Sequence, residues 1–423
     1  MNRKMKDSGI EWIGVVPEGW RIERLKNFGW TRTGISSLKQ DDFGHGFPFL
    51  NYKNVYKNFE VDYNAIELVD CTELEREKYS IKKGDIFFTG SSETIEELGL
   101  SSVALKDWEN AVFNGFTIRF RPTNKELDTN YSKYLFRSEV CRGYLAANDN
   151  SITRANLSQQ RLLCMSIVIP PLSEQTAIAN FLEDKCSKID SLIELQHKMI
   201  DELKEYKKGI IQKVTTKGIN NTEFKESGIE WIGEVPDEWV VKKLSMLIKL
   251  RQETGNFSTC FNFLGLENIE SWSGKYVETE NDYSEKQSDR YYKGDLLFSK
   301  LRPYLAKIYL AKEDGFCTGE FLVIKNFVGN LKYLFYVLLS QNFIDIVNSS
   351  TYGTKMPRAS WNFIKNLNIP YPPLPEQITI ASYLDEKCSN IDKIIDLKHQ
   401  KIAELKDYKK SLIYEYVTGK REV

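Results

Sequence analysis

The sequence predicts a mixed α/β protein built from two tandem copies of one module, each a globular domain followed by a long helix. Two observations indicate this fold class. A repeat runs through the whole chain, and within each copy short β-rich runs give way to a long helical periodicity. The chain has 423 residues, of which 41% are hydrophobic. A chain of this length exceeds one ordinary core, so we expect at least two domains.

Sequence motifs of the first half recur in the second half in the same order. They include a Ser-Gly-Ile-Glu-Trp-Ile-Gly segment that leads into Pro-x-x-Trp, a Lys-Gly-Asp turn and a Pro-Pro-Leu-x-Glu-Gln motif. The separation between copies falls steadily along the chain, which indicates a duplicated module with shorter loops in its second copy. The matching segments are 6–20 with 225–239, 49–55 with 263–269, 83–85 with 293–295, and 170–175 with 372–377.

The stretches between these motifs, residues 26–165 and 245–367, hardly align. This contrast favours a constant scaffold that carries two different readers, by which we mean domains that each recognise a different target. Drift of surface loops after duplication stays an open alternative. Both stretches hold β-rich runs punctuated by Gly, Asn and Ser, and both hold a longer helical run. The predicted strands lie at 85–88, 116–120 and 321–325, and the predicted helices at 131–145 and 331–347.

A proline pair ends each domain, and Ser173 or Pro375 then opens a long helix with a Glu in its first turn. Apolar residues in each helix repeat with a period of about 3.5 to 3.6 residues. A single apolar stripe of this length needs a partner. The other copy is the obvious one, in an antiparallel coiled coil with pseudo-twofold symmetry; packing of each helix on its own domain is the alternative. The stripes are Ile189, Leu192, Ile193, Met199, Ile200, Leu203, Ile210, Ile211 and Val214, and Ile391, Ile394, Ile395, Ile402, Leu405, Leu412 and Ile413.

The chain therefore divides into a first domain at 1–170, a helical region at 171–218, a second domain at 219–371 and a second helical region at 372–423. A periodic stretch of about 28 residues, at ~1.5 Å per residue, makes a rod of ~42 Å. That length corresponds to ~12 base pairs of B-DNA. Two readers held this far apart would meet the same face of a duplex, so the predicted target is two unlike half-sites around an unread spacer.

Charge and composition restrict the class of protein. The chain has 58 Lys and Arg against 59 Asp and Glu, whereas DNA-binding domains are typically basic. DNA binding therefore requires basic residues clustered on one face, or partners that supply phosphate contacts. No stretch approaches the ~20 apolar residues that span a bilayer, and the N-terminus shows no secretion signal. The seven cysteines form no Cys-x-x-Cys pair, so we expect a cytoplasmic protein with reduced thiols and no membrane contact.

Motifs of catalysis are missing from the sequence. There is no Gly-rich phosphate loop ending in Gly-Lys-Ser/Thr, and segments 169–172 and 371–374 lack the polar and aromatic residues that flank Pro-Pro in adenine methyltransferases. The acidic triplets near the helix starts are interpreted as solvated charge. His45, His197 and His399 form no cluster with cysteines, and Cys186 and Cys388 are expected to pack within the helices. We predict no catalytic residue, metal or cofactor in this chain.

With the Pro-x-x-Trp, Lys-Gly-Asp and Pro-Pro-Leu-x-Glu-Gln motifs each present twice and in order, the chain resembles the specificity subunits of Type I restriction-modification systems over essentially its whole length. The resemblance implies two target recognition domains that each read one half of a bipartite double-stranded DNA site. It implies helical regions that set the spacer and bind two methyltransferase (modification) subunits. It also implies that S-adenosylmethionine, ATP and Mg serve those subunits and restriction/translocase subunits, and not this chain.

Base reading requires Arg, Lys, Asn, Gln or Ser side chains that reach groove edges, while Lys and Arg on phosphates fix the register. Segments 150–154 and 353–358 stand at matching places before the last strand of each domain, which favours Arg154 and Arg358. The repeated Trp12, Trp20, Trp231 and Trp239 are interpreted as packing anchors. The candidate DNA contacts are Lys53, Asn54, Ser91, Ser92, Arg154 and Asn156 in the first domain, and Asn268, Lys300, Arg302, Lys307, Lys355 and Arg358 in the second.

Two other classes of protein remain open. A scaffold whose coiled coil joins two non-DNA-binding domains fits the balanced charge, and it would fail to bind DNA even with a methyltransferase present. An enzyme with a site shared between the two halves would show a compact acidic or His-containing cluster.

Overall fold

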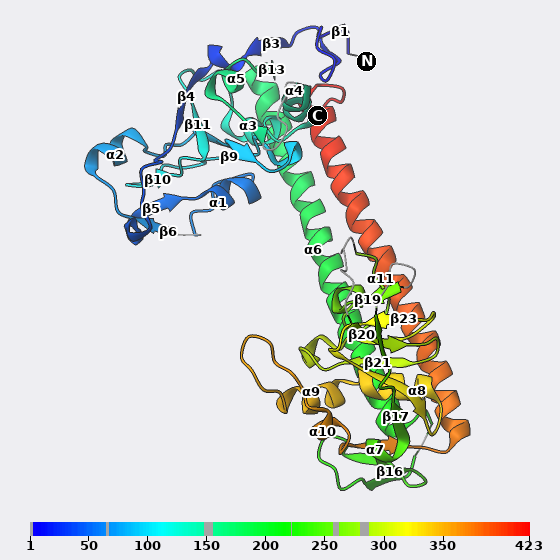
Figure 1. The fold of residues 1–423 in the computed structure, drawn as a ribbon. Coiled ribbons are helices and arrows are strands. Elements are labelled where there is room, and N and C mark those ends of the chain that lie inside the picture. The colour runs from blue at the N-terminus through cyan, green and yellow to red at the C-terminus, as the bar shows by residue number, and fades with distance from the viewer. Residues whose placement is uncertain (1–2, 65–66, 148–154, 221, 257–261, 280–286) are drawn as a thin grey trace. The chain divides into compact units, whose positions relative to one another are not determined.

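Two long helices and two mixed α/β regions make up the computed structural model, which describes residues 3–64, 67–147, 155–220, 222–256, 262–279 and 287–423 (Figure 1). The chain divides into unit 1, with residues 1–195 and 400–423, and unit 2, with residues 196–399. The helices are α6 (Leu172–Lys217) and α11 (Leu374–Val417), and both unit boundaries fall inside them. We call the part of unit 1 before α6 domain 1, and the part of unit 2 between the helices domain 2. The predicted mixed α/β class is confirmed.

A four-stranded antiparallel sheet forms the centre of domain 1. Its strand β7 reads Ile-Phe-Phe-Thr and is buried at every position, with Ile86 and Phe88 in one apolar cluster and Phe87 in another. Successive side chains of a strand point to opposite faces, so both faces of this sheet are covered. The order is β4 (Gly29–Thr33), β11 (Thr117–Pro122), β7 (Ile86–Thr89) and β9 (Ser101–Val103).

Domain 2 repeats this central sheet with the same strand order. The sheet consists of β17 (Ile248–Leu250), β24 (Phe321–Phe327), β21 (Leu296–Ser299) and β22 (Ile308–Leu310). In both domains the strand that leads into the sheet pairs with the last strand before the long helix. These pairs are β3 (Arg21–Arg24) with β13 (Ser166–Ile169), and β16 (Val240–Lys243) with β25 (Asn368–Tyr371).

A second sheet in each domain differs between the copies. Domain 1 has three strands, β10 (Val112–Phe113), β5 (Phe43–Leu50) and β6 (Glu67–Val69). Domain 2 has four, β18 (Thr254–Asn256), β20 (Gln287–Tyr291), β23 (Gly315–Cys317) and β19 (Asn262–Leu264). The small hairpins that precede the domains are β1 (Met5–Asp7) with β2 (Val15–Pro17) and β14 (Phe224–Glu226) with β15 (Glu234–Pro236).

Each helical run predicted before the long helix is in fact two helices. In domain 1 the break follows α3 (Thr129–Leu135), and in domain 2 it follows α8 (Leu331–Leu339). At both breaks a serine hydroxyl donates to a carbonyl of the preceding turn, from Ser138 to Leu135 over 2.6 Å and from Ser340 to Val337 over 2.7 Å. Serine competes in this way with helix continuation. The second helices are α4 (Glu139–Ala147) and α9 (Gln341–Ser349).

The Lys-Gly-Asp motif is a structural turn. Gly84 and Gly294 both have a φ of 89°, in the region that favours glycine. The following carboxylates then hold an arginine, with Asp85 accepting from Arg121 over 2.6 Å and Asp295 accepting from Arg251 over 2.8 Å. The motif recurs because both sheets need this turn.

The two long helices pair with opposite directions within each unit. In unit 2, Lys398 Nζ donates to Gln196 Oε1 over 3.2 Å and Lys207 Nζ to Asp392 Oδ1 over 2.7 Å. In unit 1, Lys409 Nζ lies 2.7 Å from Asp190 Oδ2. Partner numbers fall along α11 as they rise along α6, so the predicted antiparallel pairing is confirmed. None of the helices in the described part of the chain combines the length and apolar character needed to cross a membrane.

The helices have 46 and 44 residues, more than the ~28 residues that the periodic stretch suggested. They begin at Leu172 and Leu374, one residue before the predicted starts, and their first turns pack on their own domains. The apolar stripe predicted on each helix is also wider than the surface along which the two helices contact each other. Leu192 and Ile394 were expected between the helices, yet their side chains are exposed.

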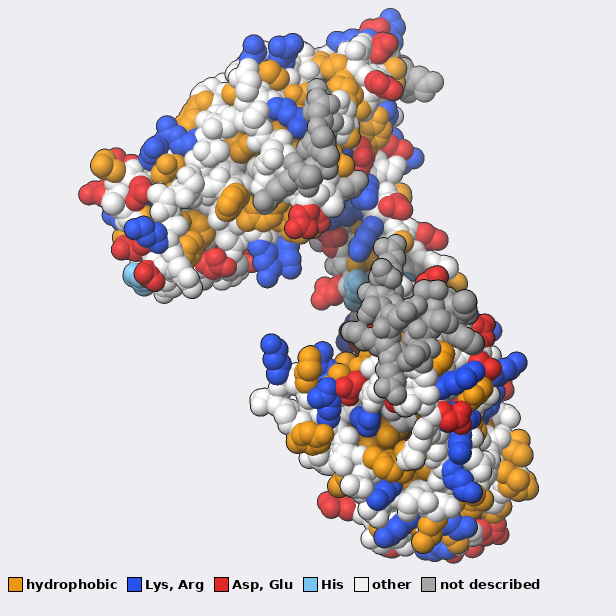
Figure 2. All heavy atoms as spheres, viewed as in Figure 1, with side chains coloured by type: hydrophobic (Ala, Val, Ile, Leu, Met, Phe, Trp, Pro, Cys, Tyr) orange, Lys and Arg blue, Asp and Glu red, His pale blue; other side chains and the backbone are white. Residues whose placement is uncertain are grey.

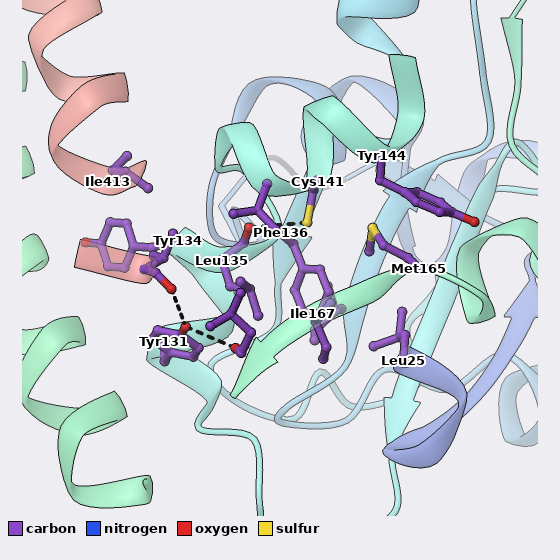
Figure 3. Close-up of a cluster of buried hydrophobic side chains, with 14 of the residues drawn as sticks. Leu25, Tyr131, Tyr134, Leu135, Phe136, Cys141, Tyr144, Met165, Ile167 and Ile413 are labelled. Atoms are coloured by element: carbon purple, nitrogen blue, oxygen red, sulfur yellow. Dashed lines mark hydrogen bonds between the residues drawn. The ribbon is translucent and has the colours of Figure 1, made fainter. Parts of the chain in front are cut away.

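Each domain core also holds the end of the helix that belongs to the other repeat. Tyr131 OH lies 3.2 Å from both Val168 O and Val417 O, and Ile413 of α11 lies on the same buried cluster (Figure 3). Tyr333 OH has the equivalent contacts in unit 2, with Pro370 O at 3.0 Å and Thr215 O at 3.4 Å. Domain and helix pair therefore share one core in each unit.

Candidate nucleic-acid interface

In each domain, three segments far apart in the sequence meet where β7 or β21 ends and where β11 or β24 begins. We call this meeting point the junction. Junction 1 consists of residues 90–92, 114–116 and 155–157, and junction 2 of residues 300–302, 318–320 and 357–359. A short helix follows the third segment in both, α5 (Gln159–Leu163) and α10 (Trp361–Ile364).

The same backbone hydrogen bonds build both junctions. In junction 1, Gly90 N donates to Phe116 O over 2.8 Å, and Leu157 N donates to Gly90 O over 2.9 Å. In junction 2, Lys300 N donates to Glu320 O over 2.8 Å, and Ala359 N donates to Lys300 O over 2.9 Å. These bonds make Phe116 the structural equivalent of Glu320. They also make Asn156 the equivalent of Arg358, because each directly precedes the residue that donates to the first segment.

Junction 1 presents neutral side chains among its described residues. β8 (Ser91–Ser92) pairs with β12 (Ala155–Asn156). This pairing places Ser91 next to Asn156, and both are candidates from the sequence. Asn156 is exposed, and the Phe116 side chain beside them is 64% exposed. Arg154, also predicted here, lies outside the described residues.

Junction 2 presents charged side chains on the same frame. Arg358 forms isolated bridges with Leu301 and Tyr352, and its guanidinium binds the Glu320 carboxylate, with Nη2 2.6 Å from Oε1. Arg302 has a φ of 49°, a left-handed conformation that is costly for a residue with a Cβ. Backbone strain of this kind is concentrated at functional sites.

Four of the predicted contacts are used inside the protein, and we withdraw them as DNA contacts. Asn54 is 5% exposed and its amide binds both backbone groups of Asp62, at 2.7 Å and 3.0 Å. Asn268, at the matching repeat position, is 2% exposed and accepts from Gly265 N over 2.8 Å. In both copies the asparagine Nδ2 donates to a carbonyl of the segment that follows, Asp62 O or Val277 O, so these asparagines recur as internal tethers.

The other two are Ser92 and Lys307. Ser92 is buried and its hydroxyl donates to Glu97 over 3.1 Å. Lys307 Nζ donates to Leu266 O over 2.7 Å, and burial lowers the pKa of this amine below its usual value. Because this half-buried amine already donates to a backbone carbonyl, we withdraw it as a phosphate contact.

The remaining candidates keep side chains at the surface, wholly or in part. Lys53 lies on α1 (Tyr52–Lys57) and is exposed, as is Lys355 before junction 2, while Lys300 and Arg302 are half-buried. Sequence reasoning missed Phe116, Glu320 and the exposed Tyr352. The first two directly precede the matched strands β11 and β24, so alignment of those strands would have pointed to them.

On the face shown in Figure 2, Lys and Arg side chains are interspersed with Asp and Glu over both units. Among the described residues, no group of three or more His, Cys, Asp or Glu is placed to hold a metal ion. Cys186 and Cys388 are buried as expected, and burial raises the pKa of each thiol to about 11. The face shown in Figure 2 therefore presents mixed charge rather than a broad positive field.

Known proteins provide a further comparison. Residues 17–205 and 236–407 match the family described as type I restriction modification DNA specificity domain. The MjaVIII type I restriction enzyme specificity subunit of Methanocaldococcus jannaschii is 25% identical over 436 residues, which cover 96% of this chain and 94% of that protein.

Solved structures share the fold of this chain. A chain from a structure of the type I R-M system has a TM-score of 0.70 at 15% identity, with coverage of 95% of this chain and 98% of that one. The HsdS subunit of Thermoanaerobacter tengcongensis has a TM-score of 0.54 at 15% identity, with coverage of 96% and 98%. At these identities the likeness shows the shared architecture.

Proposed function

This chain belongs to the family of type I restriction-modification DNA specificity domains, and on that premise we propose that each of its domains reads one half of a bipartite, asymmetric DNA target. The observation that carries the proposal is the pair of junctions. One backbone frame, built by equivalent hydrogen bonds, presents Phe116 and Asn156 in domain 1 but Glu320 and Arg358 in domain 2. Unlike side chains on a common frame are what two different base sequences require.

We assign the surface candidates to two kinds of contact. Ser91, Asn156 and Arg358 have the donors and acceptors that read base edges. Lys53, Lys300, Arg302 and Lys355 are cations suited to phosphates, which fix register without carrying sequence information. Arg154 stays a proposal from the sequence. The net charge of -1 supports a division of labour in which partner subunits supply much of the phosphate contact.

The helices carry the proposed partner surface. Leu192 and Leu195 of unit 1 are 47% and 49% exposed, and Ile394 and Leu397 of unit 2, at the equivalent repeat positions, are 44% and 62% exposed. Apolar pairs left uncovered on both copies fit two identical partners. We propose that each pair docks one modification subunit, and that restriction subunits join the assembly. Methylation and cleavage, with S-adenosylmethionine, ATP and Mg, would belong to those subunits.

Helix length is the proposed determinant of the spacer between the half-sites. α6 and α11 each continue without a break from one unit into the other, which supports this role. We propose that the chain acts in the cytoplasm, where its DNA target lies, and it is consistent with this that the six described cysteines are free.

Selection from a randomised duplex library tests the proposed function. The full chain with its modification subunits should enrich two fixed half-sites around a spacer of constant length. Exchange of residues 300–302, 318–320 and 357–359 for other sequences should change one half-site and leave the other intact. If no bipartite sequence is enriched, the chain would instead be a scaffold that joins two domains without reading DNA.

A further inference from the structure

Arg358 and Glu320 form a fixed pair at the surface of junction 2. Glu320 Oε1 accepts from Arg358 Nη2 over 2.6 Å, and Glu320 Oε2 accepts from Arg358 Nε over 3.0 Å. The Arg358 side chain is 42% exposed and that of Glu320 is 23% exposed. The carboxylate therefore occupies one edge of the guanidinium, while the group as a whole remains open to solvent.

The second edge of the same guanidinium is available to a ligand. Arginine has five N–H donors in a rigid fork. Glu320 takes the donors on the Nε side, and Nη1 and the outer hydrogen of Nη2 have no acceptor among the described residues. Two parallel N–H groups on a planar edge match a ligand with two adjacent acceptors.

The backbone holds this pair in place before any ligand arrives. Arg358 exchanges two hydrogen bonds of 3.1 Å with Tyr352, and the neighbouring Pro357 carbonyl accepts from Arg302 N over 2.8 Å. Glu320 directly precedes β24 of the central sheet and accepts from Lys300 N. A side chain held on rigid elements loses little freedom on binding, which favours specific recognition.

We propose that the Arg358–Glu320 pair reads a G·C base pair in the half-site of domain 2, an inference that rests on the proposed function. Guanine offers O6 and N7 as adjacent acceptors in the major groove, and a bidentate bond to them is the commonest specific contact between arginine and a base. The cytosine of the same pair offers an N4 amino donor, which a glutamate accepts. One Arg and one Glu side by side thus match both members of one base pair.

A phosphate is the other ligand with two suitable acceptors. The Glu320 carboxylate argues against it, because a second anion beside the fork repels a phosphate but accepts a cytosine amino group. Junction 1 has Phe116 and Asn156 at the equivalent positions, so it lacks this Arg–Glu reader. The two half-sites should therefore differ at the base pair that faces the junction.

Binding of duplex libraries by the full chain with its modification subunits tests the inference. We expect wild-type protein to require G·C at one position of the domain 2 half-site, and Arg358→Ala to lose this requirement by about tenfold to a hundredfold while the other positions stay fixed. Arg358→Lys keeps the charge but not the fork, and should also lose it. Glu320→Gln should weaken the preference for cytosine on the opposite strand. Lys325→Ala, which removes an exposed cation of β24, is the matched control and should keep the full motif.

Two results would overturn the inference without touching the proposed function. One is a uniform loss of affinity for all sequences in Arg358→Ala, which indicates a phosphate contact. The other is a wild-type motif with an A·T pair, or no preference, at every position that responds to Arg358. Loss of folding is separated from loss of reading by Arg358→Lys, which should retain the domain 1 half-site and the thermal midpoint of the wild type. Absence of any motif in the wild-type protein would instead refute the proposed function itself.

Discussion

The indole Nε1 of Trp20 donates a hydrogen bond to Glu174 Oε2 over 3.0 Å, and so ties the Pro-x-x-Trp motif to the first turn of α6. Trp239 makes the same bond to Glu376 over 2.8 Å at the start of α11. Both indoles are buried. The two motifs recur together because they are two sides of one contact, which fixes where each long helix leaves its domain.

We predict that Trp239→Phe destabilises the protein by about 1–3 kcal/mol, since the phenyl ring cannot donate the hydrogen bond that the buried indole gives to the Glu376 carboxylate. Urea unfolding followed by circular dichroism measures the change. Trp361→Phe is the control, because the structure gives that half-buried indole no hydrogen bond. Equal losses in the two variants would show that ring volume, and not the indole donor, stabilises the contact.

At the Lys-Gly-Asp turn of domain 2, one arginine forms both a buried and an exposed ion pair, and the contributions of the two pairs to stability can be compared. Arg251 pairs with the buried Asp295 at 2.8 Å and with the exposed Glu253 at 2.7 Å. Asp295→Asn should cost about 2 kcal/mol, because it removes the buried carboxylate that accepts charge-assisted hydrogen bonds from this half-buried cation. Glu253→Gln should cost far less, since solvent screens that pair. The prediction is wrong if chemical denaturation ranks the two variants the other way.

Acid should weaken unit 1 through Glu183. Burial disfavours the charged carboxylate, but hydrogen bonds from Lys133 and Tyr134 outweigh it and hold the pKa of Glu183 below its usual value. A folded-state pKa below the unfolded one adds stability above the unfolded value of about 4.3, and this is lost as the pH falls through the folded pKa. Glu183→Gln should flatten the pH dependence of the urea midpoint in that window. An unchanged slope would show that other carboxylates cause the acid sensitivity.

Partner docking should depend on the exposed apolar pairs of the helices. Leu192→Ser with Leu195→Ser should remove one modification subunit from the complex while stability changes by less than about 0.5 kcal/mol, as at other surface positions. Sedimentation of the assembled complex counts the subunits. Met246→Ser, an exposed apolar residue of domain 2, should leave two bound. A complex that keeps both subunits in the double variant contradicts the proposed docking site.

Shortening both helices should shorten the spacer. Removal of one heptad from each at facing positions, 196–202 and 398–404, keeps the apolar stripe in phase and spares the exposed apolar pairs proposed to dock the partner subunits. The seven residues correspond to ~10 Å of helix, or ~3 base pairs. Duplexes with spacers of graded length measure the preferred separation. A preference that does not move would exclude helix length as its determinant.

Several features of this protein were predictable from the sequence because each is expressed locally. The duplication shows as recurring motifs, β7 as a run of apolar residues and α6 as a long helical period. The breaks at Ser138 and Ser340 were not predictable in this way, because the apolar period continues across them. A single hydroxyl that bonds the previous turn decides that the helix stops.

The sequence by itself determined that two copies of one scaffold carry different surfaces, since motif order and helical period need no knowledge of distant contacts. Only the tertiary structure decided which polar residues reach those surfaces. Asn268 and Arg358 are both polar residues of domain 2 that suit base reading, yet Asn268 is an internal tether while Arg358 meets Glu320 at an exposed junction. The difference lies in partners brought from remote segments, because a polar side chain that is already paired in the interior has no donor or acceptor left for a ligand.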